Sequence, residues 1–280
     1  RVLVDNFSGK GSSERTDTLP AGFVRFEHTL AEMPLMLYAG LGYTERFPDY
    51  WELFSPNTGA VGSVNAFDGI KPEKTTQFDF GAQYKADNLE AWASGYVGQV
   101  RDFILFDYRP GMMGTTSQAR NVDATRWGGE AELTWHFAPN WKIGQSLAYT
   151  RGKNTTDNLP LAQTPPLESK TSIGYDDGTF SAALLLRAVA GQNRIAPGQG
   201  NIVGQDLKTA SAGYGVVSLN AGWKISPNAS LNLGVDNLFD RTYSEHISKA
   251  TAYDVAAAGQ VGARINEPGR QFWLKLNAKF

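Results

Sequence analysis

The chain has 280 residues, of which 41% are hydrophobic and 19% are charged, with a formal net charge of -2 and an isoelectric point near 6.0. The absence of cysteine excludes a disulfide scaffold and a thiolate metal site, and the near-neutral charge gives no electrostatic reason to expect a nucleic-acid partner. No apolar run approaches the ~18–20 residues that a membrane-spanning helix requires.

The first residues, Arg1 to Asp5, do not form an initiator segment, and no signal peptide precedes them. They read as the end of a strand. We therefore expect the chain to be the C-terminal fragment of a longer protein.

Apolar and polar residues then alternate with a period of two in one segment after another. In chain order these segments are residues 35–41, 77–85, 130–137, 180–187, 217–225, 231–236 and 270–280. Residues 89–107 are also expected to be extended, although their pattern does not indicate which face is outward. A period of two gives each strand one apolar and one largely polar face.

The last strand shows this pattern most clearly. Phe272, Leu274, Leu276, Ala278 and Phe280 fall on one side, and the chain ends on an aromatic residue with no tail. This is typical of a bacterial outer-membrane barrel, in which the apolar face contacts lipid and the polar face lines a wet interior.

The connections between these strands alternate in length. Short ones, rich in the Pro, Gly, Asn and Asp of tight hairpins, fall at 31–34, 86–88, 138–140, 176–178 and 226–229. Long polar ones fall at roughly 7–19, 47–73, 108–118, 152–166, 191–211 and 240–267. The sequence therefore predicts an all-β, transmembrane antiparallel β-barrel with short periplasmic turns, long extracellular loops, and about eleven complete strands after a partial first one. A soluble propeller or sandwich would not be expected to alternate its loop lengths so regularly.

Two motifs near the C-terminus refine this prediction. The first, Gly234 to Tyr243, reads GVDNLFDRTY, and the second, Glu267 to Trp273, reads EPGRQFW. Together they resemble the closing strands of TonB-dependent outer-membrane receptors. Pro268 and Gly269 interrupt the preceding loop, and Arg270 is expected where the last strand enters the outer interface. The residues that carry this resemblance, and that we interpret as structural, are Asp236, Asn237, Leu238, Phe239, Asp240, Pro268, Gly269, Arg270 and Phe280.

Four further segments resemble one branch of that family, the TonB-dependent copper receptors of the OprC and NosA type. They are residues 43–53, 71–77, 119–123 and 200–206. The resemblance implies that residues 1–280 are the C-terminal portion of a 22-stranded barrel whose N-terminal plug and early strands are absent. It further implies a bacterial outer-membrane location and copper as the substrate. The implied partners are outer-membrane lipid, the TonB complex through the missing N-terminal part, and the remaining plug and barrel segments, with no nucleic acid.

Copper binding favours sulfur and imidazole ligands. The four methionines are Met33, Met36, Met112 and Met113, and the three histidines are His28, His136 and His246. The pair Met112 and Met113 lies in an expected extracellular loop, where it could meet a cuprous ion or simply pack against other loops. No closely spaced ligand set is present, so this pair is expected to be auxiliary at most and the principal metal site to lie outside this chain. No bound cofactor is expected.

No catalytic motif is found, so no enzymatic activity is expected. A receptor for an iron siderophore or another metal chelate has the same fold and remains an alternative. A twelve-stranded autotransporter translocator is an alternative of a different class, but it requires an N-terminal helix. Residues 1–30 lack helical periodicity, and the VDNLFD sequence also argues against it.

Overall fold

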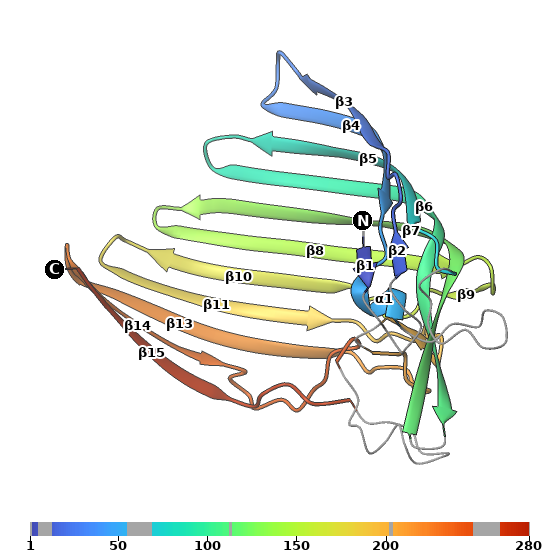
Figure 1. The fold of residues 1–280 in the computed structure, drawn as a ribbon. Coiled ribbons are helices and arrows are strands. Elements are labelled where there is room, and N and C mark those ends of the chain that lie inside the picture. The colour runs from blue at the N-terminus through green and yellow to red at the C-terminus, as the bar shows by residue number, and fades with distance from the viewer. Residues whose placement is uncertain are drawn as a thin grey trace.

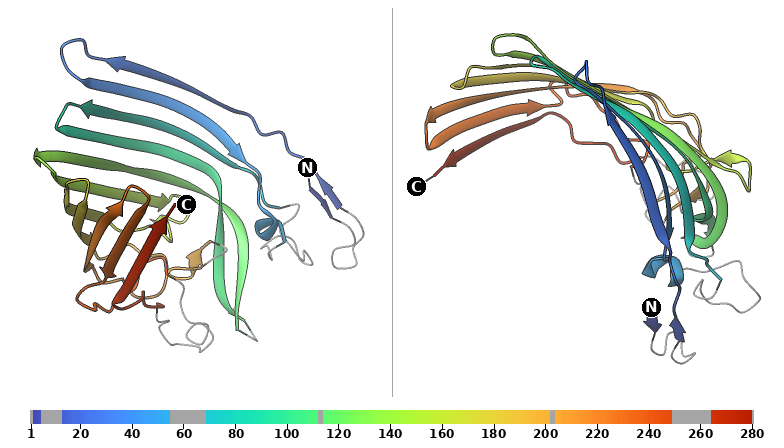
Figure 2. Two further views of the ribbon diagram at one scale, coloured as in Figure 1. Left: turned by 90° about the vertical axis from the view of Figure 1, so that its left-hand side faces the viewer. Right: turned by 90° about the horizontal axis from the view of Figure 1, so that it is seen from above.

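The computed structural model describes residues 2–4, 13–54, 69–111, 114–201, 204–248 and 264–279. These residues form one large, curved antiparallel sheet that is open at both edges (Figures 1 and 2). The strands along its path are β3 (Ala21–Thr29), β4 (Leu35–Arg46), β5 (Glu73–Lys85), β6 (Leu89–Gly111), β7 (Gly114–Ala138), β8 (Trp141–Asn154), β10 (Glu168–Asp176), β11 (Phe180–Val189), β13 (Tyr214–Ser226), β14 (Ala229–Asp236) and β15 (Gln271–Ala278). Each strand pairs with the next along this path, as expected of a barrel wall built from consecutive hairpins.

Five short elements complete the described structure. Strands β9 (Leu159–Pro160) and β12 (Gln199–Gly200) pair with β8 and β6, and the only helix within the described residues is α1 (Tyr50–Phe54). Strands β1 (Val2–Val4) and β2 (Ser13–Arg15) form a separate two-stranded sheet. Within the described part of the chain, no helix is long and apolar enough to cross a membrane.

The ends of the large sheet do not meet. Strand β15 pairs with β14, and β3 pairs with β4, while no pairing joins β3 to β15 in the described residues. In lipid an unpaired strand edge leaves backbone groups without hydrogen bonds, at several kcal/mol for each group. These two edges therefore require partner strands that the described residues do not supply.

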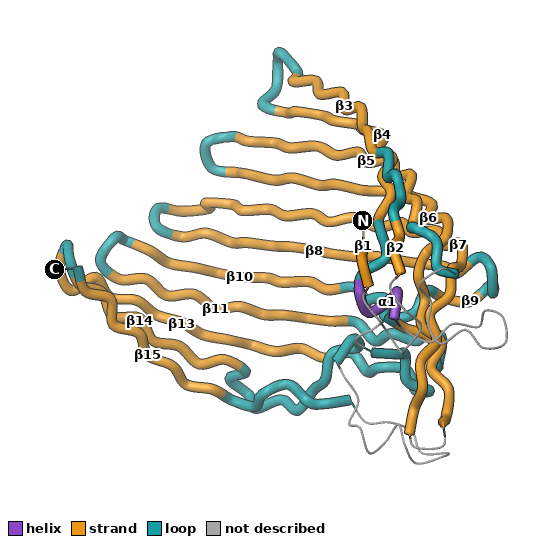
Figure 3. Tube along the Cα trace, viewed as in Figure 1, coloured by secondary structure: helices purple, strands orange, loops and turns teal. Residues whose placement is uncertain are grey.

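The turns have the predicted asymmetry. All five short hairpins lie at one end of the sheet, and the long connections lie at the other end (Figure 3). The turn between β10 and β11 illustrates the local cause. Asp177 Oδ1 accepts from the backbone amides of Thr179 and Phe180, and Gly178 takes a positive φ of 85°.

The pairing register shows which residues of neighbouring strands lie on the same face of the sheet. Leu41 on β4 lies opposite Phe78 on β5, which lies opposite Val97 on β6 and then Trp127 on β7. The same face carries Leu184, Leu219 and Leu233 further along the sheet and is apolar and exposed. This is the outward, lipid-facing surface, and it includes Leu89, Ala91, Ala93 and Val97 of the segment whose face the sequence left open. The opposite, interior face is largely polar.

Aromatic side chains mark both ends of the apolar band. Trp135, Trp141, Tyr175, Phe180 and Trp223 lie near the short turns, and the rings of Phe180 and Trp223 are stacked with centroids 6.0 Å apart. Near the loops, the rings of Trp127 and Tyr149 meet edge to face at 5.4 Å. Along β8, Trp141 and Tyr149 are separated by about 20 Å of height for a strand rising ~3.4 Å per residue at a tilt near 40°, close to the apolar band of an outer-membrane barrel. Trp135, Trp141 and Trp223 near the short turns, and Tyr149 near the loops, therefore occupy the positions of interfacial aromatic residues.

Two expectations for individual segments were wrong. Residues 108–118 were expected to be a loop but continue strands β6 and β7, with Tyr108 paired to Ser117 and Gly111 to Gly114. The buried run Ile104 to Phe106, which packs with Ile70 and Ala119, carries these strands beyond the rest of the sheet. The partial first strand pairs with β2 rather than joining the large sheet.

The register also places the last strand at a defined height. Leu276 lies opposite Leu231, which lies opposite Trp223, so Leu276 is level with the aromatic residues near the short turns. Leu274, opposite Leu233, lies one step deeper. Leu276 therefore lies nearer the short-turn end of the band than Leu184 and Leu219, which are direct partners.

Candidate functional site

Three long connections pack together at the end of the sheet opposite the short turns (Figure 3). They are residues 155–167, residues 190–213 without 202–203, and residues 237–248 with 264–270. We call this group of connections the loop cap. Its members are joined by hydrogen bonds between residues 28 to 43 positions apart in the sequence, such as Gln192 with Thr164 and Gln163 with Asp206.

Asp206 holds the loop cap together. Its side chain is completely buried, and Oδ1 accepts from the backbone amide and the side-chain amide of Gln163, each at 3.0 Å. Oδ2 accepts from the backbone amide of Ala196 at 2.9 Å. Burial alone would raise the pKa of Asp206, but the His246 ring and the hydrogen bonds from Ala196 and Gln163 outweigh burial and hold the pKa below its ordinary value. The carboxylate therefore remains charged and joins two of the three connections.

His246 brings in the third connection. Its Nε2 lies 3.5 Å from Oδ1 of Asp206, and its Nδ1 lies 3.1 Å from the hydroxyl of Ser211. This order of serine, histidine and aspartate resembles a hydrolase triad, a set that the sequence did not reveal. All three side chains are buried, and the aspartate oxygens are occupied by loop amides. We therefore interpret the arrangement as a structural connection between loops.

A second network fixes the long β6–β7 hairpin to the loop cap. Arg120 on β7 contacts Asp107 on β6 and Asp157 in the cap, both at 2.5 Å. Asp157 also accepts from Asn154 and Gln199. The hydrogen bond from Arg120, followed by those from Gln199 and Asn154, holds the pKa of Asp157 below its ordinary range despite partial desolvation.

A cavity of ≈ 290 Å³ lies between the loop cap and the interior face of the sheet. Its lining includes Glu130, Glu168, Arg187, Glu245 and His246. Arg187 donates to Glu168 at 2.6 Å and to Glu245 at 2.7 Å, so these charges are largely paired with one another. The lining offers carboxylates and one buried imidazole, which is an oxygen-rich set that suits hard cations better than a cuprous ion.

The sulfur and imidazole residues predicted as possible copper ligands are scattered. Met33 lies in the turn before β4, Met36 on the interior face of β4, and His28 on β3 beside Phe26. His136 lies near the turn after β7, far from His246 in the loop cap. Within the described residues no group of three or more His, Asp or Glu side chains could hold a metal ion. Met112 and Met113 lie outside the described residues.

The first closing motif forms a tight corner after β14. Asn237 is buried with a positive φ of 51°, and its side-chain amide donates to the carbonyl oxygens of Arg241 and Pro268. Its Oδ1 accepts from the backbone amide of Arg241 at 2.8 Å. Leu238 continues the corner by donating its amide to the Val217 carbonyl. Asparagine suits this position because it tolerates a left-handed backbone while its side chain replaces missing backbone partners.

The second closing motif is attached to the same corner. Asp240, whose φ is 55°, accepts through Oδ1 from the backbone amide of Arg270 at 2.8 Å. A Cβ added at Gly269 would collide with that Asp240 oxygen, which explains the glycine. Phe239 is exposed, and Asp236 is paired with Gln271 on the interior face of the sheet. Phe280 lies outside the described residues. The two motifs therefore position the start of β15.

We expect Asn237→Ala to destabilise the barrel by about 2–3 kcal/mol, because two buried carbonyls and one amide lose their partner. Urea unfolding of the full-length protein in micelles would measure this loss. Asn228→Ala, in the exposed turn after β13, is the matched control and should change the free energy of unfolding by less than about 0.5 kcal/mol. Equal losses in the two variants would contradict the structural role assigned to Asn237.

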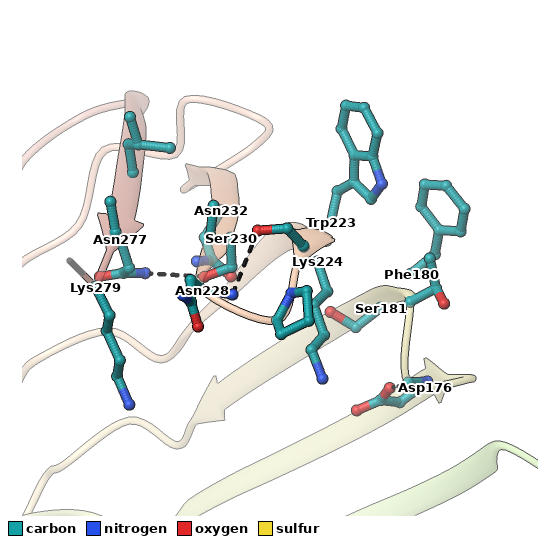
Figure 4. Close-up of a pocket in the computed structure, with 18 residues that line it drawn as sticks. Asp176, Phe180, Ser181, Trp223, Lys224, Asn228, Ser230, Asn232, Asn277 and Lys279 are labelled. Atoms are coloured by element: carbon teal, nitrogen blue, oxygen red, sulfur yellow. Dashed lines mark hydrogen bonds between the residues drawn. The ribbon is translucent and has the colours of Figure 1, made fainter.

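The interior face near the short turns contains a second hollow, of ≈ 700 Å³. Figure 4 shows Lys224, Lys279 and Asp176 on one side of the sheet and the rings of Phe180 and Trp223 on the other. Asn277 donates to Ser230 at 3.3 Å along the floor. The polar side chains mark the wet interior, and the rings mark the outward face.

Comparison with known proteins agrees with this architecture. Residues 3–238 match the family model described as "TonB dependent receptor-like, beta-barrel". The solved structure of the copper transporter OprC superposes with a TM-score of 0.90 at 57% sequence identity, covering 95% of this chain and 41% of OprC.

Two curated relatives are receptors for ferric enterobactin by name. The ferric enterobactin receptor of Pseudomonas aeruginosa is 25% identical over 288 residues, which are 92% of this chain and 37% of that protein. The ferrienterobactin receptor of Escherichia coli K12 is 37% identical over 250 residues, which are 81% of this chain and 33% of that protein. The chain thus spans about a third of the length of these relatives. It belongs to the TonB-dependent receptors, and its sheet is part of their outer-membrane β-barrel.

Proposed function

We propose that this chain is the C-terminal barrel portion of a TonB-dependent receptor that takes up copper. The observation that carries the proposal is the 57% identity and TM-score of 0.90 with the copper transporter OprC. A ferric enterobactin receptor reaches 24% identity and a TM-score of 0.71 over a similar share of the chain. Siderophore uptake is therefore the second candidate function, and it has weaker support.

In the proposed receptor, residues 1–280 are one part of a larger barrel that surrounds an N-terminal plug, and TonB acts through the N-terminal part. The two free edges at β3 and β15 are consistent with further wall strands. The polar interior face and the loop cap would line the route from the cell exterior to the plug.

Copper is the proposed substrate, and its principal ligands are proposed to lie outside this chain. The described methionine and histidine side chains belong to different elements and face different sides of the sheet. Met112 and Met113 together supply two thioethers, too few for a complete copper shell.

Metal analysis of the purified full-length receptor tests the substrate. After exposure to copper or to ferric enterobactin, we expect bound copper and no bound iron, and we expect copper uptake by cells to require TonB. Bound iron with no copper would establish the siderophore alternative and contradict the proposal.

The double variant Met112→Leu with Met113→Leu tests the location of the site, because leucine preserves size and removes sulfur. We expect copper uptake to fall modestly, by about twofold to threefold on the scale of one weak contact, and tight copper binding to survive. Met33→Leu, in a turn at the opposite end of the sheet, is the control and should have no effect. Complete loss of bound copper in the double variant would place the principal site at Met112 and Met113.

A further inference from the structure

A groove of ≈ 770 Å³ crosses the outward face of strands β4, β5, β6 and β7. Nearly all of its lining belongs to the outward-facing residues of those strands, from Leu41 and Tyr43 on β4 to Thr125 and Trp127 on β7. The groove changes in character along the strands, because its part nearer the short turns is apolar and its part nearer the loops is polar and cationic.

The apolar part consists of four cross-strand partners, Leu41, Phe78, Val97 and Trp127, all of them exposed. Trp127 packs against Tyr149 and marks the loop-side end of the apolar band. This part of the groove therefore lies at the depth where lipid acyl chains contact the barrel.

The cationic part begins one or two outward-facing residues further along each strand. Lys74 and Arg101 are direct partners in the register between β5 and β6, an arrangement in which like charges repel. Strand β8 continues the positive row with Arg151 and Lys153, which are partners of Trp127 and Thr125.

Carboxylates offset only part of this charge. Asp102 contacts Lys74 at 3.3 Å and Lys71 at 3.9 Å, and Asp102 also faces Asp123, which accepts from its backbone amide. Glu45 is the partner of Lys74 on the β4 side and accepts from the Tyr43 hydroxyl.

Arg101 and Arg151 contact no carboxylate within 4 Å among the residues that the structure describes. Burial, followed by repulsion from Arg151, lowers the pKa of the neighbouring Arg194. An excess of positive charge therefore lies just beyond the aromatic residues on the loop side. Each two-residue step along a strand spans only about 7 Å, so the cations lie within one or two steps of the aromatic rings. That height corresponds to the headgroup layer of the membrane.

We propose that this groove binds a phosphate-bearing lipid of the outer leaflet, with the phosphate between Lys74 and Arg101 and an acyl chain along Leu41, Phe78, Val97 and Trp127. A phosphate bridging the two cations would turn their mutual repulsion into two favourable ion contacts. A free phosphate ion would leave the apolar part uncovered. A second copy of the barrel related by twofold symmetry would bring two cationic rows together, which opposes that occupant.

The test uses the full-length receptor and native mass spectrometry with lipid A as the probe. In the double variant Lys74→Gln with Arg101→Gln, we expect the affinity for lipid A to fall roughly 25-fold, because one cation near an anionic lipid surface contributes about fivefold. The charge-preserving double variant Lys74→Arg with Arg101→Lys should bind within about threefold of the original protein. The control double variant Lys224→Gln with Lys275→Gln removes two cations from the interior face and should bind normally.

Two further measurements separate the possible occupants. Enzymatically dephosphorylated lipid A should bind at least tenfold more weakly than lipid A, and inorganic phosphate at millimolar concentration should not displace lipid A. Equal binding of the dephosphorylated lipid, displacement by inorganic phosphate, or an unchanged affinity in the Lys74→Gln with Arg101→Gln variant would each overturn the proposal. If the same substitutions strengthened dimerisation of the receptor, the groove would be assigned to a second copy of the barrel instead of a lipid. None of these outcomes depends on which metal the receptor carries.

Discussion

Asp206→Asn is expected to detach the loop cap from the end of the barrel. The variant replaces the buried carboxylate with a neutral amide. The new NH₂ group faces an N–H donor of Ala196 or Gln163, with which it cannot form a hydrogen bond. The loss should be about 3 kcal/mol or more, because the buried N–H donors of Ala196 and Gln163 lose their charge-assisted hydrogen bonds. Hydrogen exchange of the full-length protein should show protection falling more than a hundredfold at the amides of Gln163, Ala196 and Ser211.

Asp87→Asn provides the control, because Asp87 is exposed in the short turn between β5 and β6. It should leave exchange in the loop cap unchanged. If exchange at Ala196 and Ser211 were the same in both variants, Asp206 would not be the group that joins these connections.

The same contacts determine how the loop cap responds to acid. The folded pKa of Asp206 lies below its ordinary value, and so does that of Asp157. The stability that these carboxylates supply is therefore present above the unfolded-state pKa, near 3.9, and is lost as the pH falls through the lower folded pKa values. We expect the wild-type cap to remain docked at pH 5 and to loosen only below about pH 4.

Leu184→Arg is expected to be the most damaging single change in the lipid-facing wall. Leu184 lies on the outward face of β11 between Ile173 and Leu219, four residues from Phe180 at the aromatic end of the band. An arginine at this depth should destabilise the barrel by about 2–4 kcal/mol. A refolding titration of the full-length protein into phospholipid bilayers would measure the loss.

Leu185→Arg is the matched control, because the adjacent leucine lies on the interior face opposite Ser172 and Ser218. Its cost should be much smaller, since the guanidinium can reach water. Leu276→Arg, level with Trp223, should cost only about 0–1 kcal/mol. A larger loss for Leu185→Arg than for Leu184→Arg would show that the two faces are assigned in reverse.

The amino-acid sequence by itself determined the class of fold, the approximate number of strands and the end of the sheet that carries the loops. These features follow from local chemistry. A period of two assigns side chains to alternate faces of any extended strand, and Pro, Gly, Asn and Asp form tight turns wherever they cluster. The GVDNLFDRTY and EPGRQFW segments were also recognisable in the sequence, because each is a continuous run of residues.

Only the tertiary structure decided the outward face of residues 89–107, the height of Leu276, the length of the β6–β7 hairpin and the contacts of the loop cap. Each depends on pairing between residues distant in the sequence. A two-residue difference in register moves a side chain by about 7 Å along the strand without changing its face, so the alternation pattern contains no information on height. Asp206 likewise looks like an ordinary polar loop residue until Gln163, Ala196 and His246 surround it. Long-range hydrogen bonds between loops produce no periodic pattern in a sequence. Contact with lipid, in contrast, produces the alternation of apolar and polar residues in every strand that crosses the membrane.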